Sequence, residues 1–302
     1  MPPIISVQHL RKTYGKTVAV DDISFEVNQG EIFGFLGPNG AGKTTTVECL
    51  QALRRYDSGH LRVLGLDPIT EARLLRRRIG SQLQESALPD RIKVWEALDL
   101  FASLAPKALD WHALIEQWGL TEKYKSSFSS LSGGQRQRLF IALALVNNPE
   151  VVFLDEMTTG LDPAARRVAW DLIRAIREKG TTVVLVTHFM DEAENLCDRL
   201  AVVDRGRIIA SDTPQGLITQ HAGDVHVIFS TDSPDIAWLE KLPGANKVTR
   251  NGPRVEIEGS GPLLALVAAA LVEHGIVPPD LRIEQPNLED VFLKLTGHVA
   301  GE

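Results

Sequence analysis

The chain has 302 residues, of which 44% are hydrophobic and 24% charged, and its formal net charge at pH 7 is −7. This length can bury a full core and favours two domains. The acidic balance argues against a nucleic-acid partner, because phosphate backbones are bound by basic surfaces. Without an apolar run of 18 residues or a signal-peptide pattern, we expect a soluble chain with no membrane span.

Predicted strands open the chain. Apolar residues at strand-like spacing run through 4–10 and 18–27, on either side of a turn at 14–16. A short buried strand is predicted at 32–36, followed by a glycine-rich loop and a helix. A hairpin-like stretch follows at about 59–66.

The middle of the chain changes between helical and strand patterns. Apolar residues recur at helical spacing from about 94 to 120. Continuous apolar runs at 151–154 and 182–186 are typical of parallel strands that are covered on both faces. We therefore predict an α/β core with a mostly parallel sheet, an antiparallel β region and a helical insertion at about 86–145.

The pattern changes again after about residue 216. The predicted elements are strands at 224–230, 246–250, 254–258 and 281–284, helices at 234–242 and 262–274, and a last amphipathic helix at 288–295. The order β-α-β-β-α-β is that of the ferredoxin-like fold. We therefore expect two domains, a large one at 1–216 and a small α+β domain at 222–302.

The glycine-rich loop after the strand at 32–36 is the most informative stretch. It matches the pattern G-x-x-x-x-G-K-[ST] in the required strand–loop–helix context. Its backbone N–H groups can surround a phosphate, and Lys43 can reach the outer phosphates while the Thr44 hydroxyl binds Mg²⁺. The residues predicted to bind a nucleoside triphosphate here are Gly37, Pro38, Asn39, Gly40, Ala41, Gly42, Lys43, Thr44 and Thr45.

Two carboxylates end the apolar strand at 151–154. In phosphate-loop proteins such a strand lies beside the loop, so Asp155 is predicted to hold Mg²⁺ directly or through water. Glu156 can then polarise the water that attacks the γ-phosphate. A strand that ends in Asp-Glu usually leads only into a solvated turn, but the phosphate loop favours the functional interpretation.

A second anion-binding helix N-terminus is predicted where residues 131–135 read Leu-Ser-Gly-Gly-Gln. The alternative is an ordinary N-cap serine with a Gly-Gly turn. With this motif the sequence resembles the ATP-binding cassette (ABC) ATPases over about 4–214, because their signature motif reads as this pentapeptide does. The resemblance implies that Ser132, Gly133, Gly134 and Gln135 contact ATP.

The resemblance implies roles for further residues. Tyr14 stands where the family has an aromatic residue that stacks on adenine, with an ordinary half-buried strand aromatic as the alternative. Gln84 takes the place of the glutamine that contacts Mg²⁺ and senses the transport subunit, and Gln82 competes for that assignment. Asp162 matches the D-loop, which communicates between the two sites of a dimer, and His188 matches the switch histidine at the γ-phosphate.

Two classes of ABC ATPase are then open. One is the ATPase subunit of a transporter with separate transmembrane subunits, and the other is a soluble ATPase that acts in translation, DNA repair or cofactor assembly. A single intact cassette, and an ending at 288–297 that resembles exporter ATPases of the ABC-2 type, favour an exporter subunit.

The resemblance also implies how such a subunit assembles and where it works. Two copies would sandwich two ATP molecules with Mg²⁺, and the C-terminal domain would add a further dimer contact. The homodimer would lie on the cytoplasmic face of the cell membrane, bound to the transmembrane subunits.

Overall fold

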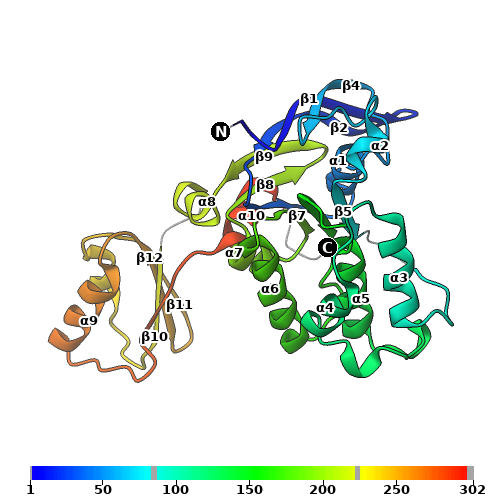
Figure 1. The fold of residues 1–302 in the computed structure, drawn as a ribbon. Helices are drawn as coiled ribbons and strands as arrows, with labels where there is room; N and C mark the ends of the chain where they lie inside the picture. Colours follow the sequence, from blue (N-terminus) through cyan, green and yellow to red (C-terminus); the bar gives the residue numbers. More distant parts are fainter. Residues whose placement is uncertain (1, 83–86, 222–224, 298–302) are drawn as a thin grey trace. The chain divides into compact units, whose positions relative to one another are not determined.

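The computed structural model describes residues 2–82, 87–221 and 225–297 (Figure 1). It divides into two compact units, of which one contains Met1–Gln215 and the other Gly216–Val299. Among the described residues, no helix combines the length and the apolar character needed to cross a membrane.

A six-stranded sheet forms the centre of the first unit (Figure 1). In spatial order its strands are β5 (Ile79–Gln82), β6 (Val151–Asp155), β7 (Thr182–Thr187), β3 (Ile32–Leu36), β8 (Arg199–Asp204) and β9 (Arg207–Asp212). All neighbouring pairs are parallel except β8 and β9, which form an antiparallel hairpin. β3, β6 and β7 are buried along their whole length, as their continuous apolar runs predict.

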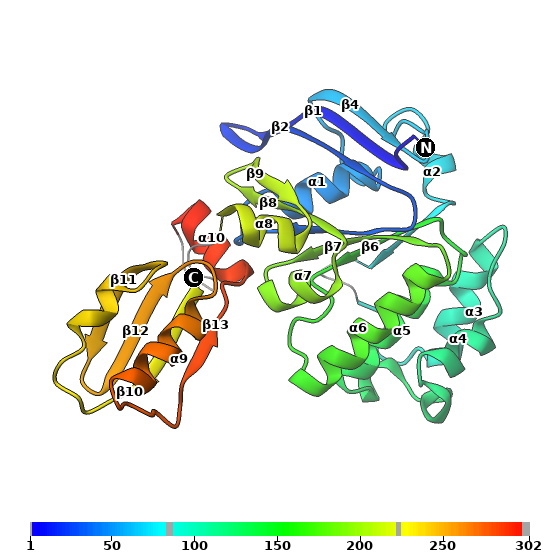
Figure 2. The same ribbon diagram turned by 90° about the vertical axis from the view of Figure 1, so that its left-hand side faces the viewer.

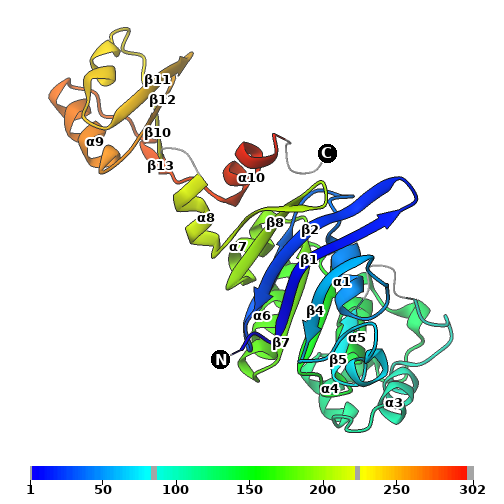
Figure 3. The same cartoon turned by 90° about the horizontal axis from the view of Figure 1, so that it is seen from above.

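A smaller antiparallel sheet covers one side of the central sheet. Its strands lie side by side in the order β2 (Thr17–Val27), β1 (Ile5–Tyr14) and β4 (Ser58–Val63) (Figure 3). Helix α1 (Lys43–Leu50) lies between the two sheets (Figure 2). The core at this interface includes a cluster of aromatic rings, with centroids 5.1 to 5.5 Å apart, from Phe25, Phe33 and Phe35.

Helices cover the opposite face of the central sheet (Figure 2). They include α5 (Gly133–Leu145), α6 (Pro163–Glu178) and α7 (Met190–Leu196). Trp170, Ile173 and Ile176 on one face of α6 are buried, which is the amphipathic pattern of a helix packed on one side.

The helical insertion contains separate short helices instead of one continuous pattern. They are α3 (Val94–Leu104), α4 (Trp111–Gln117) and two 3₁₀ turns, η1 (Thr121–Lys123) and η2 (Phe128–Ser130). The short helix α2 (Ala72–Leu75) lies before the insertion, ahead of β5. The predicted helical run from 94 to 120 is broken because Pro106 restricts Ala105 to an extended conformation, which ends α3. Asp110 then starts α4 as its N-cap, with its side chain accepting from His112 N.

The second unit has the predicted ferredoxin-like topology. Its antiparallel sheet has the order β11 (Ala245–Asn251), β12 (Arg254–Gly259), β10 (Val225–Ser230) and β13 (Arg282–Glu284). Its helices are α9 (Leu263–Glu273) and α10 (Leu288–Thr296), and α8 (Pro214–His221) begins in the first unit and continues into the second. The helix predicted at 234–242 is only a 3₁₀ turn, η3 (Ala237–Lys241).

The core of the second unit is separate from that of the first. Buried residues of β10, β12 and α9 form it together with Leu239 of η3. The role of this unit in dimerisation stays a prediction, since the structure describes a single copy of the chain.

Candidate active site

The phosphate loop joins β3 to α1. Two of its glycines are required because the backbone of neighbouring strands leaves no room for a side chain. Gly42 has a φ of 99°, which L residues rarely adopt, and a side chain there would collide with the carbonyl oxygen of Ala19. A side chain at Gly37 would collide in the same way with the carbonyl oxygen of Val203. The loop is thus held against β2 and β8 by contacts that only glycine permits.

Lys43 is held inside this loop. Its Nζ donates to the carbonyl oxygens of Gly37 and Pro38 at 2.7 and 2.9 Å, and the residue is only 4% exposed. Burial lowers the pKa of Lys43, while the nearby carboxylates of Glu156 and Asp155 oppose that effect. The ammonium is therefore positioned where the outer phosphates of a nucleotide would meet the loop.

Asp155, the last residue of β6, is suited to a hard cation. It is 3% exposed, and burial raises its pKa from 3.8 to about 6, while a hydrogen bond from Thr44 lowers it. Asp155 Oδ1 is buried and has no hydrogen-bond partner among the described residues. An unpaired carboxylate oxygen beside a hydroxyl group is the kind of donor set that Mg²⁺ takes.

Glu156 follows in a strained conformation. Its φ is 49°, in the left-handed region that costs a non-glycine residue about 1–3 kcal/mol. The N–H of Glu156 donates to the carbonyl oxygen of Val186 in β7 at 2.9 Å. This turn places Glu156 Oε1 at 3.2 Å from Nδ1 of His188, just beyond the end of β7.

Strand order explains why these groups meet. β6, which ends in Asp155, is separated from β3 by β7. The carboxyl ends of parallel strands share one edge of the sheet, so Lys43, Asp155, Glu156 and His188 still gather there. The intervening β7 places His188 at the same edge, next to Glu156, while Thr44 of α1 reaches Asp155 directly through its hydroxyl.

The signature residues form a different surface. Ser132 is the N-cap of α5, accepting from Gln135 N at 3.3 Å, and its own N–H donates to Gln135 Oε1 at 3.0 Å. A side chain at Gly133 would meet nothing within 4 Å, so packing does not require this glycine. The bare N-terminus of α5 is open to an anion.

A cavity of about 380 Å³ lies next to this helix end. The residues that line it on either side include Ser132, Gly133, Gly134, Gly160, Leu161 and Asp162. Asp162 is the N-cap of α6, where it accepts from Ala165 N at 2.9 Å. The D-loop and the signature helix therefore share one cavity.

For two of the predicted site residues, Tyr14 and Gln84, the structure does not test the predicted role. Tyr14 ends β1 and is 41% exposed, with Lys12 Nζ and the Arg54 guanidinium 5.4 and 5.2 Å from its ring centroid. Its stacking on adenine stays a prediction. Gln84 lies outside the described residues, whereas Gln82 is buried at the end of β5 beside β6. The choice between the two glutamines therefore also stays a prediction.

Sequence reasoning missed one buried charge near the site. Glu192 in α7 is fully buried, although the pattern of α7 resembles an ordinary amphipathic helix. The sequence did contain a signal for this burial. Glu192 lies beside the apolar residue Ala193 and one helical turn before Leu196, so it shares the buried face of α7 with them.

Comparisons with known proteins identify the family. Residues 20–159 match the family model described as ABC transporter. The chain is 41% identical to Nod factor export ATP-binding protein I of Ralstonia nicotianae, covering 98% of this chain and 94% of that protein. It is 37% identical to daunorubicin resistance ATP-binding protein DrrA2 of Streptomyces coeruleorubidus, covering 97% and 95%. The chain belongs to the ABC transporter ATP-binding proteins.

Solved structures agree with this assignment. An ATP-binding subunit of an ABC transporter is 25% identical with a TM-score of 0.66, covering 72% of this chain and 92% of that one. A dimeric bacterial ABC transporter cassette is 26% identical with a TM-score of 0.62, covering 69% and 98%. The family resemblance and the fold class are thereby confirmed, this ABC protein is an ATPase, and the non-transport alternative is not favoured.

We expect Asp155→Asn to stabilise the nucleotide-free chain at alkaline pH. The folded pKa of Asp155 lies above its ordinary value, so stability that is present below pH 3.8 is lost as the pH rises through about 6. The difference between 3.8 and about 6 corresponds to about 3 kcal/mol, which the substitution would recover.

Calorimetric melting with EDTA at pH 5 and pH 8 measures this effect. The gain in Tm should be larger at pH 8, and the exposed residue Asp171 gives the control Asp171→Asn, which should leave Tm unchanged at both values. Equal melting of native and Asp155→Asn chains at pH 8 would show that the buried charge is not unfavourable.

Proposed function

We propose that this ABC ATPase powers export through separate transmembrane subunits and works as a homodimer on the cytoplasmic face of the membrane. The observation that carries the proposal is the meeting of Lys43, Asp155, Glu156 and His188 at one edge of the sheet. The names of the relatives, Nod factor export and daunorubicin resistance proteins, support export as the direction.

Phosphate binding falls to the loop and to α1. The loop's N–H groups and the Lys43 ammonium neutralise the outer phosphates, which replace the carbonyl oxygens of Gly37 and Pro38 as acceptors. Thr44 and Asp155 would hold Mg²⁺, which supplies charge neutralisation between the phosphates when bound.

Hydrolysis falls to the pair formed by Glu156 and His188. Glu156 accepts a hydrogen bond from the attacking water and draws its proton as the oxygen bonds to the γ-phosphorus. The bond to the β-phosphate oxygen then breaks, leaving ADP and phosphate. Because Nδ1 of His188 faces Glu156, its Nε2 is available to the γ-phosphate oxygens.

A second copy of the chain completes each site. None of the described residues that line the signature cavity comes from the phosphate loop, so Ser132 and its neighbours need a nucleotide held elsewhere. A dimeric cassette is known among the similar structures. ATP held by one chain would therefore be capped by the signature helix of the other, and hydrolysis would release that bridge.

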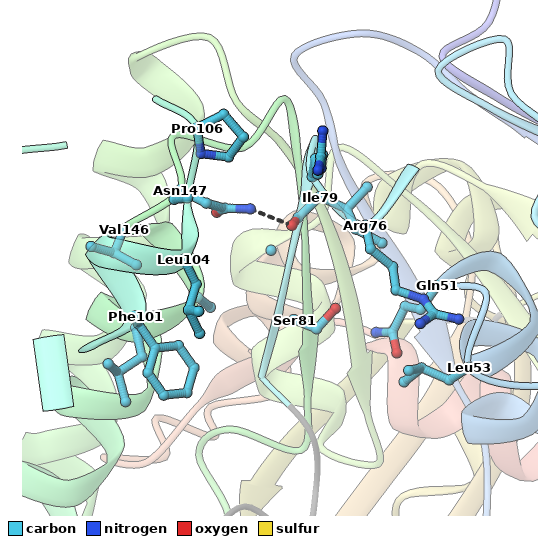
Figure 4. A pocket seen from close by; sticks show the side chains of 15 residues that line it. Gln51, Leu53, Arg76, Ile79, Ser81, Phe101, Leu104, Pro106, Val146 and Asn147 are labelled. Carbon is cyan, nitrogen blue, oxygen red and sulfur yellow. Dashed lines mark hydrogen bonds between the residues drawn. The ribbon is translucent and has the colours of Figure 1, made fainter. Parts of the chain in front are cut away.

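A groove offers a docking site for the membrane subunit (Figure 4). It has a volume of about 320 Å³ and lies between β5, α3 and the end of α5, where Asn147 Nδ2 donates to Ile79 O at 2.7 Å. Phe101 and Leu104 of α3 line one side, and Leu53 lines the other. An apolar groove of this kind fits a short amphipathic helix, and Arg76 and Arg77 at its edge favour acidic side chains on that helix.

Glu156→Gln should slow hydrolysis at least about 100-fold, because the amide keeps the shape but cannot take the proton from water. ATP affinity should be retained, and an ATP-bound dimer should accumulate in size-exclusion chromatography. Glu150→Gln, immediately before the same strand, is the matched control, since Glu150 is exposed and its carboxylate pairs with Arg78. Phosphate release at the native rate from Glu156→Gln would remove Glu156 from the mechanism.

A mixed dimer tests the composite site. A Lys43→Ala chain and a Ser132→Arg chain should each be inactive, but in their heterodimer both lesions fall on one interface. The other interface keeps an intact loop and signature, so partial ATPase activity should return. Heterodimers purified through two different tags give the measurement.

The control heterodimer pairs a native chain with one that carries both substitutions. Each interface then has one lesion, and we expect little activity. The composite site would be contradicted if the control were the more active of the two heterodimers.

Leu104→Glu should release the chain from membranes. Leu104 is 75% exposed at the groove, so a charge there would oppose docking without disturbing the fold or ATP binding. The tagged chain, expressed in cells with its transporter, should move from the membrane fraction to the supernatant. Val277→Glu, at an 81% exposed valine in the second unit, is the control and should stay with the membranes. Equal sedimentation of the two variants would rule out this groove.

A further inference from the structure

Glu192 is a fully buried carboxylate to which the mechanism above gives no role. It lies in the first turn of α7, four residues after His188. Buried charges need hydrogen-bond partners or opposite charges, so the groups around Glu192 should reveal what it does.

Three segments of the chain meet at this carboxylate. Trp170 of α6 donates its Nε1–H to Glu192 Oε1 at 3.3 Å. Burial raises the pKa of Glu192, and the neighbouring hydroxyls of Thr187 and Thr158 oppose that effect. Thr187 directly precedes His188, Thr158 lies in the turn after Glu156, and Trp170 belongs to the helix that begins after the D-loop residue Asp162.

Thr158 is a neighbour of Glu192 that does not complete a hydrogen bond to it in this conformation. Thr158 Oγ1 and Glu192 Oε2 are both buried, and neither has a hydrogen-bond partner within the described part of the chain. One is a donor and the other an acceptor, and each is costly to leave unpaired. A small movement of the turn that carries Thr158 would satisfy both atoms together.

A second set of contacts holds the segment after His188 against α6. The guanidinium of Arg166 lies 4.3 Å from the ring centroid of Phe189, and its Nη1 is 3.2 Å from Asp191 Oδ2. Arg166 and Trp170 are four residues apart and therefore share a face of α6. The D-loop helix is thus joined by direct contacts to the segment that follows His188.

We propose that Glu192 is a positioning residue that ties the turn after Glu156 and the D-loop helix to the strand end that carries His188. When two copies close over ATP, the D-loop moves, Thr158 and Glu192 align, and the pair formed by Glu156 and His188 is set for hydrolysis. This inference rests on the proposed role of His188 and adds the link from the dimer interface to that residue.

The test separates turnover from ATP binding. Glu192→Ala should lower kcat at least about tenfold while KM and the affinity for ATP change less than about threefold, since the phosphate loop is untouched. Glu192→Gln keeps the size and an acceptor oxygen, and should recover most of kcat. Glu178→Ala, at an exposed acid that ends α6, is the control and should match the native chain.

Several results would overturn the proposal. One is a folded Glu192→Ala chain with native kcat, and another is a loss of ATP affinity as large as the loss of kcat. Glu192→Gln and Glu192→Ala with equal losses would also contradict it. If Glu192→Ala does not fold, Thr158→Val and Trp170→Phe each remove one donor, and native kcat in both would decide against the link.

His188→Ala is measured in parallel. Native hydrolysis by that variant would refute the proposed role of His188 itself. An inactive His188→Ala chain beside a fully active Glu192→Ala chain would refute only the positioning role.

Discussion

Two carboxylates and one ammonium, largely removed from water, meet where β3 and β6 end. Burial raises the pKa of Asp155 to about 6 and lowers that of Lys43, so each group loses solvation that the others only partly restore. Charges interact more strongly where water is excluded, and a bound nucleotide with a cation would supply opposite charges to these groups. The site thus gives up stability in the free chain and gains it on binding ATP.

The order of the strands connects that site to the helices that follow it. Because β7 lies between β3 and β6, His188 follows the strand next to the one that carries Glu156, and the contact between the two side chains crosses from one strand end to the next. The same two strand ends lead into the D-loop helix and α7, which meet at Glu192. In the proposed mechanism, chemistry at the γ-phosphate and contact with a second copy would therefore act on the same few turns.

Much of the site could be predicted from sequence because its parts are local. The phosphate loop needs a strand, closely spaced glycines and a helix start within a few residues, and the signature serine is an N-cap that its own pentapeptide specifies. The lengths of the helices, and the positions at which they break, were harder to predict. The helical run at 94–120 divides at Pro106, and the segment at 234–242 closes only as a 3₁₀ turn, because packing decides how far a short helix extends.

The sequence by itself determined which loop is predicted to bind phosphate, which carboxylates follow a buried strand, and which family these motifs indicate. Only the tertiary structure decided which of these groups meet. Strand order placed β7 between β3 and β6, a left-handed turn aimed Glu156 at His188, and three distant segments buried Glu192. Each depends on contacts between residues far apart in the chain, and local sequence patterns carry no information about such contacts.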